Sequence, residues 1–267
     1  MATDRFYIWG ILNCTPDSFS DGDPTAAAED FVRRGLELVA DGADVLDVGG
    51  ASSRAGAAPV TVEEELARVL PVIGALRSRC GVPISIDSYR PEIVDRALAA
   101  GANIANDIHG LRDGGAMAEV VARHGARVVA MHWRPEALRT GDILEDIQKL
   151  WGQSIAIARA AGIGPERVIL DPGFGEGFHK PLEQNLRILQ HLPQLSSAFP
   201  DCAVLFALSR KSFLGTVAGE PHPKNRDCLG AAATYGAYRD GLRHFRVHNV
   251  SLTRKILRLG EAVHGAR

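Results

Sequence analysis

Short apolar segments rich in valine and isoleucine recur along the chain, and most of them lead through a polar stretch into a helical pattern. Continuous apolar runs of four to eight residues are typical of strands that are buried on both faces. The eight runs comprise residues 6–12, 43–48, 82–86, 102–105, 126–131, 167–170, 203–208 and 243–247. Helical periodicity occupies residues 26–40, 62–79, 91–99, 116–124, 144–161 and 182–195.

The order of these segments predicts the fold class. Strands that alternate with helices form parallel sheets. Eight repeats within 267 residues favour a sheet that closes on itself, because a (β/α)8 barrel takes about 250 residues. We therefore predict an α/β protein with a single (β/α)8 TIM barrel domain over residues 1–267. In such a barrel the active site lies at the C-terminal ends of the strands.

Local signals support the boundaries between helices and strands. Gly42, Gly101 and Gly125 each follow a helical pattern and precede a strand. Glycine adopts the left-handed conformation that ends many helices, so these positions are expected helix stops. Pro91 and Pro165 lie at expected helix starts, where the fixed φ of proline is favourable.

Composition narrows the class of protein. The chain is 46% hydrophobic and 23% charged, with a net charge of −2, which is ordinary for a globular enzyme. Charges of both signs are interspersed, so we expect no nucleic-acid partner. There is no run of 18 apolar residues and no signal-peptide pattern, so we expect no membrane association. The four cysteines form no C-x-x-C pair, which favours free thiols in the reducing cytoplasm.

Polar residues occupy the end of every predicted strand. Helix capping explains some of them, but capping predicts a polar residue directly before a helix, and most of these precede several more loop residues. Because the strands of a barrel end at one mouth, we expect the side chains to converge there. They are Asn13, Asp47, Asp87, Asn106, Asp107, His132, Asp171, Ser209, Arg246 and His248.

The residue types at these ends indicate two kinds of ligand. Asp87, Asn106 and Asp171 supply acceptors and an amide, which suit a flat heterocycle with paired N–H donors. Cations near the same rim suit a phosphate or diphosphate; they are Arg54, Lys211, Arg246 and His248. The side-chain oxygen of Asn13 suits a Mg²⁺ ion that such phosphates bind.

Several motifs at these positions resemble those of the dihydropteroate synthases. Residues 10–22 (GILNCTPDSFSDG) are similar to the N-terminal signature of that family. Seven further matches follow in the family's order: 47–54 (DVGGASSR), 85–89 (SIDSY), 106–108 (NDI), 131–132 (MH), 171–175 (DPGFG), 209–213 (SRKSF) and 246–248 (RVH). The resemblance therefore spans nearly the whole chain.

The resemblance implies a transferase of folate biosynthesis. Members of the family join 4-aminobenzoate to 6-hydroxymethyl-7,8-dihydropterin diphosphate and release diphosphate, with Mg²⁺ as the cofactor. Carried over to matching positions, the pterin-binding residues are Asp87, Asn106, Met131, Asp171 and Lys211. The diphosphate-binding residues are Asn13, which also binds the metal, Arg54, Arg246 and His248. Those near the aminobenzoate are Ser53, Phe178 and Ser209, and the catalytic residues are Asp87, Lys211 and Arg246.

The chain departs from the family pattern at three places. The usual STRPG is SSRAG at residues 52–56, and the usual DPGFGFGK is DPGFGEGFHK at residues 171–180. Glu176 therefore stands where the family has a phenylalanine, and Phe178 is the candidate that fills this space from a loop about two residues longer. Asn249 replaces the commoner aspartate. The first two changes resemble those of sulfonamide-insensitive synthases, so we expect weak binding of sulfonamides.

Two other functions remain open at this point. The first is a pterin-binding paralogue without catalytic activity, because both altered loops border the aminobenzoate side. The second is a methyltransferase that passes a methyl group from methyltetrahydrofolate to a corrinoid, although that reaction needs no diphosphate site. The resemblance also implies a homodimer, for which the apolar stretch at residues 229–238 is a candidate contact.

Overall fold

A computed structural model describes residues 5–15, 24–51, 59–138 and 141–264 of the chain. Eight parallel strands follow one another around a closed barrel, each paired with its neighbours in sequence, and the last closes against the first. The strands are β1 (Tyr7–Asn13), β2 (Val45–Gly49), β3 (Ile84–Asp87), β4 (Ile104–Asp107), β5 (Arg127–Met131), β6 (Val168–Asp171), β7 (Ala203–Phe206) and β8 (His244–Val247). The predicted (β/α)8 TIM barrel is therefore confirmed.

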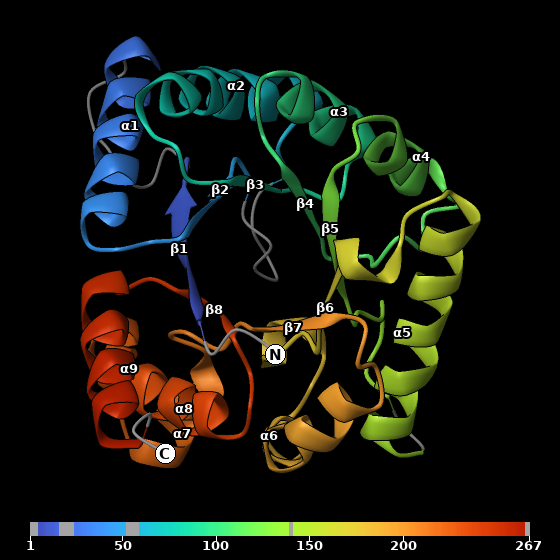
Figure 1. Ribbon diagram of the computed structural model, residues 1–267, viewed down its shortest axis with the longest axis vertical. Helices are drawn as coiled ribbons and strands as arrows, with labels where there is room; N and C mark the ends of the chain where they lie inside the picture. The colour runs from blue at the N-terminus through green and yellow to red at the C-terminus, as the bar shows by residue number, and fades with distance from the viewer. Residues whose placement is uncertain (1–4, 16–23, 52–58, 139–140, 265–267) are drawn as a thin grey trace.

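Helices surround the strands, as Figure 1 shows. They are α1 (Pro24–Ala40), α2 (Val62–Arg79), α3 (Pro91–Ala99), α4 (Ala116–Arg123), α5 (Ile143–Ala160), α6 (Leu182–Ser197), α7 (Ser212–Ala218), α8 (Asp227–Arg239) and α9 (Val250–His264). Within the described residues, three short 3₁₀ turns interrupt the loops: η2 (Pro165–Arg167), η3 (Glu176–Phe178) and η4 (Pro223–Arg226). The segment between β7 and β8 holds both the short α7 and the longer α8; neither of these helices, nor α9, was among the predicted ones.

The predicted boundaries of the helices have local causes. Thr61 and Glu64 form a reciprocal capping box at the start of α2, in which the Thr61 hydroxyl accepts a hydrogen bond from the Glu64 amide at 3.2 Å. Pro91 begins α3, as predicted. Gly101 follows α3 with φ +113°, and a Cβ atom there would lie 2.7 Å from Cγ of Arg77. Only glycine fits this turn without strain.

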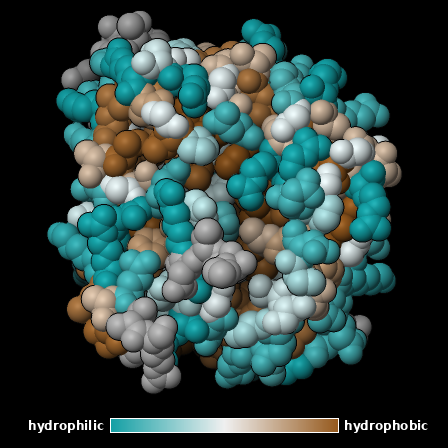
Figure 2. Space-filling model, viewed as in Figure 1, coloured by the Kyte–Doolittle hydropathy of each residue, from teal (hydrophilic) through white to brown (hydrophobic). Residues whose placement is uncertain are grey.

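The hydrophobic core has two parts. One fills the inside of the barrel, where each strand contributes residues of one face; its buried members are Trp9, Val45, Ile104, Val129, Ile169 and Leu205. The larger part lies between the strands and the helices. Polar and charged side chains cover much of the face seen in Figure 2, with smaller hydrophobic areas between them. No helix in the described ranges is long and apolar enough to cross a membrane.

Candidate active site

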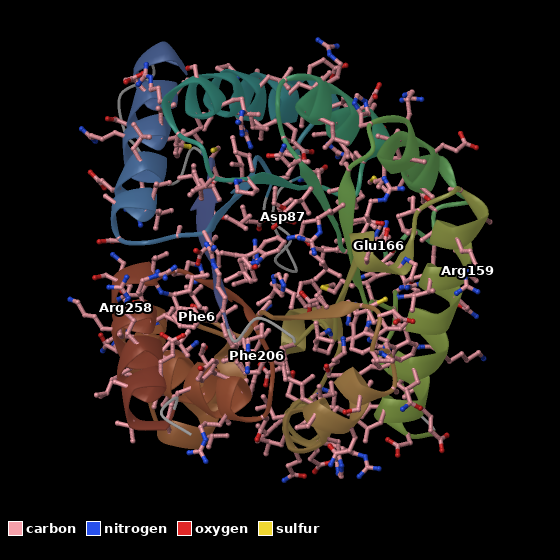
Figure 3. All side chains as sticks on the ribbon, viewed as in Figure 1. Phe6, Asp87, Arg159, Glu166, Phe206 and Arg258 are labelled. Carbon is pink, nitrogen blue, oxygen red and sulfur yellow. The ribbon has the colours of Figure 1, made fainter. Side chains whose placement is uncertain are left out.

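The C-terminal ends of the strands carry most of the polar residues that the sequence analysis singled out. Asn13, Asp87 and Asp171 are the last residues of β1, β3 and β6, and Asn106 is the penultimate residue of β4. In Figure 3, Asp87 lies within the ring of strands, whereas Arg159 and Arg258 lie on the outer helices. The barrel thus brings these side chains to one mouth.

A hydrogen-bonded ionic cluster forms the floor of the mouth. Arg246 of β8 bridges two carboxylates: its Nε donates to Oδ2 of Asp47 at 2.6 Å, and its Nη2 donates to Oδ2 of Asp87 at 2.7 Å. The Asn106 amide donates to both Asp47 oxygens, at 3.3 and 3.2 Å. Asp47 is fully buried, so its charge depends on these donors. The cluster fixes the orientation of Asp87 and Asn106 before any ligand binds.

Burial perturbs the charges of this floor. Burial raises the pKa of the Asp87 carboxyl to about 7; the Arg246 cation opposes the shift, whereas the charges of Asp47 and Glu65 add to it. Burial alone would lower the pKa of Arg246, but the two carboxylates hold that pKa above its ordinary value. A carboxyl that titrates near neutral pH beside a fixed cation is a common feature of catalytic sites.

Hydrogen bonds hold both the backbone and the side chain of Asp171 in place. Its carbonyl accepts hydrogen bonds from the His132 amide at 2.8 Å and from Nε1 of Trp151 at 3.3 Å. Its Oδ1 accepts the amide proton of Gly173 at 2.6 Å. Burial raises the pKa of Asp171, and the Gly173 hydrogen bond opposes that shift. Met131 pairs with Asp171 in the register of β5 and β6 and is buried beside it.

Lys211 lies close enough to Asp87 and Asp171 to affect both carboxyl groups. Its positive charge lowers the pKa of both Asp87 and Asp171, although burial outweighs this effect in each case. Its ammonium also lies 4.4 Å from the centroid of the Phe178 ring, within the range of a cation–π contact. The structure thus brings Lys211 and Phe178 together, as the predicted site requires.

The loop after β6 accommodates its extra length in a single turn. Residues Glu176–Phe178 form η3, and His179 follows in the left-handed conformation with φ +60°. Glu176 is exposed, and its Oε2 accepts a hydrogen bond from the Ser212 hydroxyl at 2.8 Å. Phe174 instead packs in the core against Phe206 and Phe213. Phe178 is therefore the aromatic residue of this loop that contacts the candidate site.

His248 and Ser209 form a second polar pair at the rim. Nδ1 of His248 lies 3.0 Å from the Ser209 hydroxyl oxygen, which also accepts the His248 amide proton at 3.2 Å. Burial lowers the pKa of His248 to about 3, and the nearby charges of Arg210 and Arg246 act in the same direction. The imidazole is therefore neutral near pH 7 before a ligand binds.

Two of the predicted strand-end residues do not belong to the mouth. The Asp107 carboxylate accepts the amide protons of His109 at 2.8 Å and Leu111 at 2.6 Å, so it braces its own loop. His132 is buried, and its Nε2 lies 2.9 Å from Oδ2 of Asp146 on α5. Both side chains therefore stabilise the outer layer, which corrects their expected place in the ring.

The sequence reasoning underestimated Asp47 and missed Lys180. Asp47 was expected at the mouth but was given no part in binding a ligand, yet it joins Arg246 to Asn106. Lys180 is almost fully buried below the loop after β6. A buried acid within an apolar strand requires a charged or polar partner, which was the available signal for Asp47. The predicted Ser53 and Arg54 lie outside the described residues.

Comparisons with known proteins agree with this architecture. Residues 9–248 match the family model described as pterin binding enzyme. The dihydropteroate synthase of Synechocystis sp. is 38% identical over 266 residues, which cover 97% of this chain and 90% of that protein. The dihydropteroate synthase of Neisseria meningitidis serogroup B is 40% identical over 271 residues, covering 97% of this chain and 93% of that protein.

Solved structures give the same result. The Xanthomonas albilineans dihydropteroate synthase with 4-aminobenzoic acid superposes with a TM-score of 0.92 at 40% identity, covering 99% of this chain and 95% of that chain. A structure of the same organism's enzyme in complex with 7,8-dihydropteroate has a TM-score of 0.90 at 38% identity, covering 100% and 97%. Both likenesses extend over the complete barrel.

Proposed function

The chain belongs to the dihydropteroate synthase family, and from this premise we propose its reaction and the role of each site residue. It is a transferase that joins 6-hydroxymethyl-7,8-dihydropterin diphosphate to 4-aminobenzoate and releases 7,8-dihydropteroate and diphosphate. The observation that carries this proposal is the floor of the mouth, where Arg246 orients Asp87 while Asp47 orients Asn106.

The pterin ring occupies this floor in our proposal. Its paired N–H groups donate to Asp171 and Asn106, which are fixed by their own hydrogen bonds. Met131 supplies an apolar contact, and Lys211 faces the ring from the β7 side. Acceptors that are already oriented lose little entropy on binding, which favours a planar heterocycle over a flexible ligand.

The diphosphate group lies toward the rim in our proposal, where His248 and Arg54 supply donors, and the N–H groups of Arg246 that are not bonded to Asp47 or Asp87 donate to it from the floor. Protonation of His248 accompanies binding, because a neutral imidazole gains a strong anionic partner there. Asn13 fits a Mg²⁺ ion carried by the diphosphate: it is exposed at the end of β1, and its side-chain oxygen would be one of the oxygen ligands that Mg²⁺ prefers. The described part of the chain has no cluster of three acidic, histidine or cysteine ligands.

The chemistry needs charge stabilisation more than proton transfer. The bond between the pterin methylene carbon and the diphosphate oxygen breaks, and both electrons leave with the diphosphate. The ionised Asp87 carboxylate stabilises the positive charge that develops on the pterin. Bound Mg²⁺ would neutralise charge on the leaving group. The aminobenzoate nitrogen then forms the new C–N bond and loses a proton to solvent, helped by its fixed orientation.

The aminobenzoate side differs from that of ordinary synthases in our proposal. Phe178, held beneath Lys211, packs against the aromatic ring, and Ser209 and Ser53 lie near it. Glu176 adds negative charge to this side, and sulfonamides compete at the same place. We therefore propose that the enzyme is insensitive to sulfonamides. Inhibition by sulfamethoxazole as strong as that of an ordinary synthase would contradict this.

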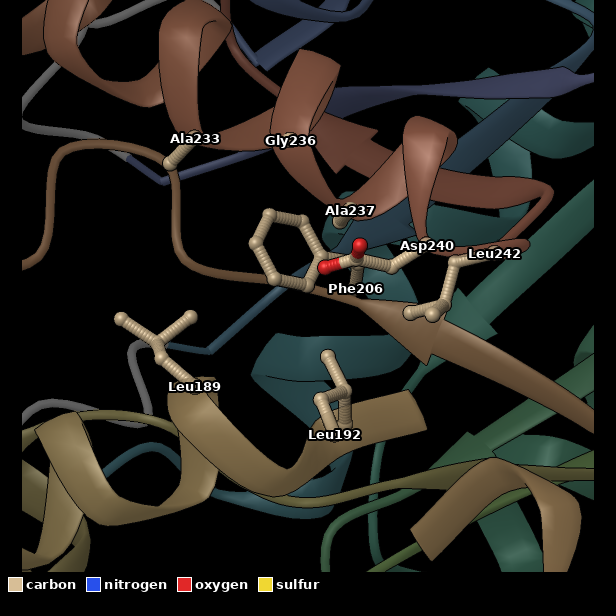
Figure 4. Close-up of a pocket in the computed structure, with 8 residues that line it drawn as sticks. All are labelled: Leu189, Leu192, Phe206, Ala233, Gly236, Ala237, Asp240 and Leu242. Atoms are coloured by element: carbon tan, nitrogen blue, oxygen red, sulfur yellow. The ribbon is translucent and has the colours of Figure 1, made fainter. Parts of the chain in front are cut away.

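Two further proposals concern assembly and location. A pocket between α6 and α8 is lined by the apolar side chains of Leu189, Leu192 and Phe206 (Figure 4), of which Leu192 and Phe206 are each only 2% exposed. We propose that a second copy of the chain covers it in a homodimer, which sedimentation equilibrium would test. A cytoplasmic location is supported by four cysteines that are all free thiols.

Diphosphate release separates this function from the two alternatives. We expect the purified protein to release diphosphate when both substrates and Mg²⁺ are present. A paralogue without activity would bind the pterin substrate but release none. A methyltransferase would instead bind methyltetrahydrofolate and transfer its methyl group without any diphosphate. The cations Lys211 and Arg246 at the mouth suit a diphosphate, so they favour the synthase over the methyltransferase.

A further inference from the structure

Lys180 is a charged residue without an evident role in the chemistry described above. It is only 2% exposed. Its ammonium donates hydrogen bonds to the carbonyl oxygens of Gly173 at 2.7 Å and of His132 at 3.2 Å. Burial lowers the pKa of Lys180 to about 7, although the charge of Asp171 opposes the shift. Burying an ammonium group costs free energy, so its presence here indicates that Lys180 has a role.

The two carbonyls that Lys180 binds belong to backbones in very close approach. Gly173 has φ +67°, and a Cβ atom there would lie 2.4 Å from the His132 carbonyl oxygen and 3.1 Å from the Lys180 ammonium. Glycine is therefore required at this position. The ammonium binds the loop after β6 to the end of β5 at the point where the two carbonyls converge.

The same glycine holds the side chain of Asp171. Its amide donates to Oδ1 of Asp171 at 2.6 Å, while its carbonyl accepts from Lys180. The orientation of Gly173 thus links the buried ammonium to the carboxylate. One carboxylate oxygen of Asp171 is therefore bonded to the backbone of its own loop.

Asn185, which is fully buried, closes the other side of the loop. Its Oδ1 accepts the Gly175 amide proton at 2.8 Å, and its Nδ2 donates to the Lys180 carbonyl at 2.7 Å. The longer segment between Gly175 and Lys180 is therefore anchored at both ends. Its extra length is taken up by η3, away from Asp171.

We propose that Lys180 is a positioning residue for Asp171 and acts on it through the backbone of Gly173; this rests on the proposed function, in which Asp171 binds the pterin. Lys180 touches no substrate in this account. Because Lys180 holds Gly173, the loop after β6 can vary in sequence and length on the aminobenzoate side while Asp171 keeps its orientation toward the pterin.

A double-mutant cycle tests the coupling between the two residues. Lys180→Met keeps the length of the side chain but removes its donors, and Lys149→Met is the matched control on the exposed face of α5. Binding of the pterin diphosphate and of inorganic diphosphate is measured by calorimetry. We expect Lys180→Met to weaken pterin diphosphate binding about tenfold, the scale of one charge-assisted hydrogen bond. We expect less than about a twofold effect in an Asp171→Asn background, and unchanged binding of inorganic diphosphate.

Other outcomes would overturn the inference. An equal loss with and without Asp171→Asn would show that Lys180 does not act through Asp171, and the same holds if Lys180→Met leaves pterin binding intact. If Asp171→Asn alone leaves pterin binding unchanged, the proposed function is wrong instead. Should Lys180→Met fail to fold, Lys180→Gln retains an amide donor. It is expected to bind the pterin diphosphate more weakly than the parent chain and the Lys149→Met control, and to show faster hydrogen exchange at the Gly173 amide; binding and exchange equal to those of the parent chain would contradict the inference.

Discussion

Replacing Asp47 by asparagine changes one charge in the floor of the mouth and nearly nothing of its shape. Asp47 is fully buried and accepts hydrogen bonds from Arg246 at 2.6 Å and from Asn106 at 3.2 Å. An asparagine keeps one oxygen but loses the charge. A hydrogen bond to a charged group contributes about 1.5–3 kcal/mol. We therefore expect kcat/KM for the pterin substrate to fall roughly 10- to 100-fold at pH 8.

The same substitution shifts the pH dependence in a direction that the structure fixes. The pKa of Asp87 is raised to about 7, and the charge of Asp47 is one cause. Because Asp87 acts as a carboxylate, kcat/KM of the parent enzyme rises as the pH rises through about 7. Burial is the largest cause of the raised pKa, and the Asp47 charge adds to it. Removing that charge lowers the pKa of Asp87, and the acid limb moves to lower pH by up to about one unit, which corresponds to roughly 1.4 kcal/mol of interaction.

Steady-state rates between pH 5 and 9 measure this shift. Asp95→Asn is the matched control, since Asp95 is a partly exposed residue of α3 in an ion pair with Arg123. We expect its profile to equal that of the parent enzyme. An acid limb in Asp47→Asn that stays in place, or that moves to higher pH, would refute the reasoning. The same holds if the control moves as far.

Three further predictions concern single residues. Gly173→Ala should lower the unfolding free energy by more than about 2 kcal/mol in a denaturant titration, because φ is +67° and the new Cβ would meet the His132 carbonyl. Phe178→Ala should raise KM for 4-aminobenzoate several-fold and leave pterin binding unchanged, since Phe178 packs beside Lys211. His132 is neutral when folded, because burial lowers its pKa to about 4. Its contribution to stability is present above pH 6.5 and is lost as the pH falls toward 4. Between pH 6.5 and pH 4 the unfolding free energy of His132→Gln should therefore fall by up to about 3 kcal/mol less than that of the parent chain.

The strands were predictable because each is a short apolar run between polar segments. Their boundaries differ from the predicted ones by at most two residues: β1 includes Asn13, and β7 ends at Phe206 rather than at residue 208. The segment between β7 and β8 was not predicted in detail. Its first helix, α7, has only seven residues, too few to give a periodic signal.

The site was predictable in its residue types and less so in its partners. Asn106 and Asp107 are neighbours on β4, so one faces the barrel interior and the other the helices. Treating both as mouth residues ignored that alternation. The pattern also placed Arg246 among the cations of the rim, whereas the structure inserts it between Asp47 and Asp87. Linear sequence contains no record of such pairings, since these residues lie on three strands.

Identification of the product is the most direct test of the proposed reaction. The enzyme is supplied with the pterin diphosphate, Mg²⁺ and 4-aminobenzoate labelled with ¹⁵N at the amine, and the products are analysed by mass spectrometry and a diphosphate assay. We expect labelled 7,8-dihydropteroate and diphosphate in equal amounts. We expect an Asp87→Ala variant to form both products much more slowly. Tight binding of the pterin without labelled product, or product formation that does not depend on Asp87, would contradict the proposed reaction.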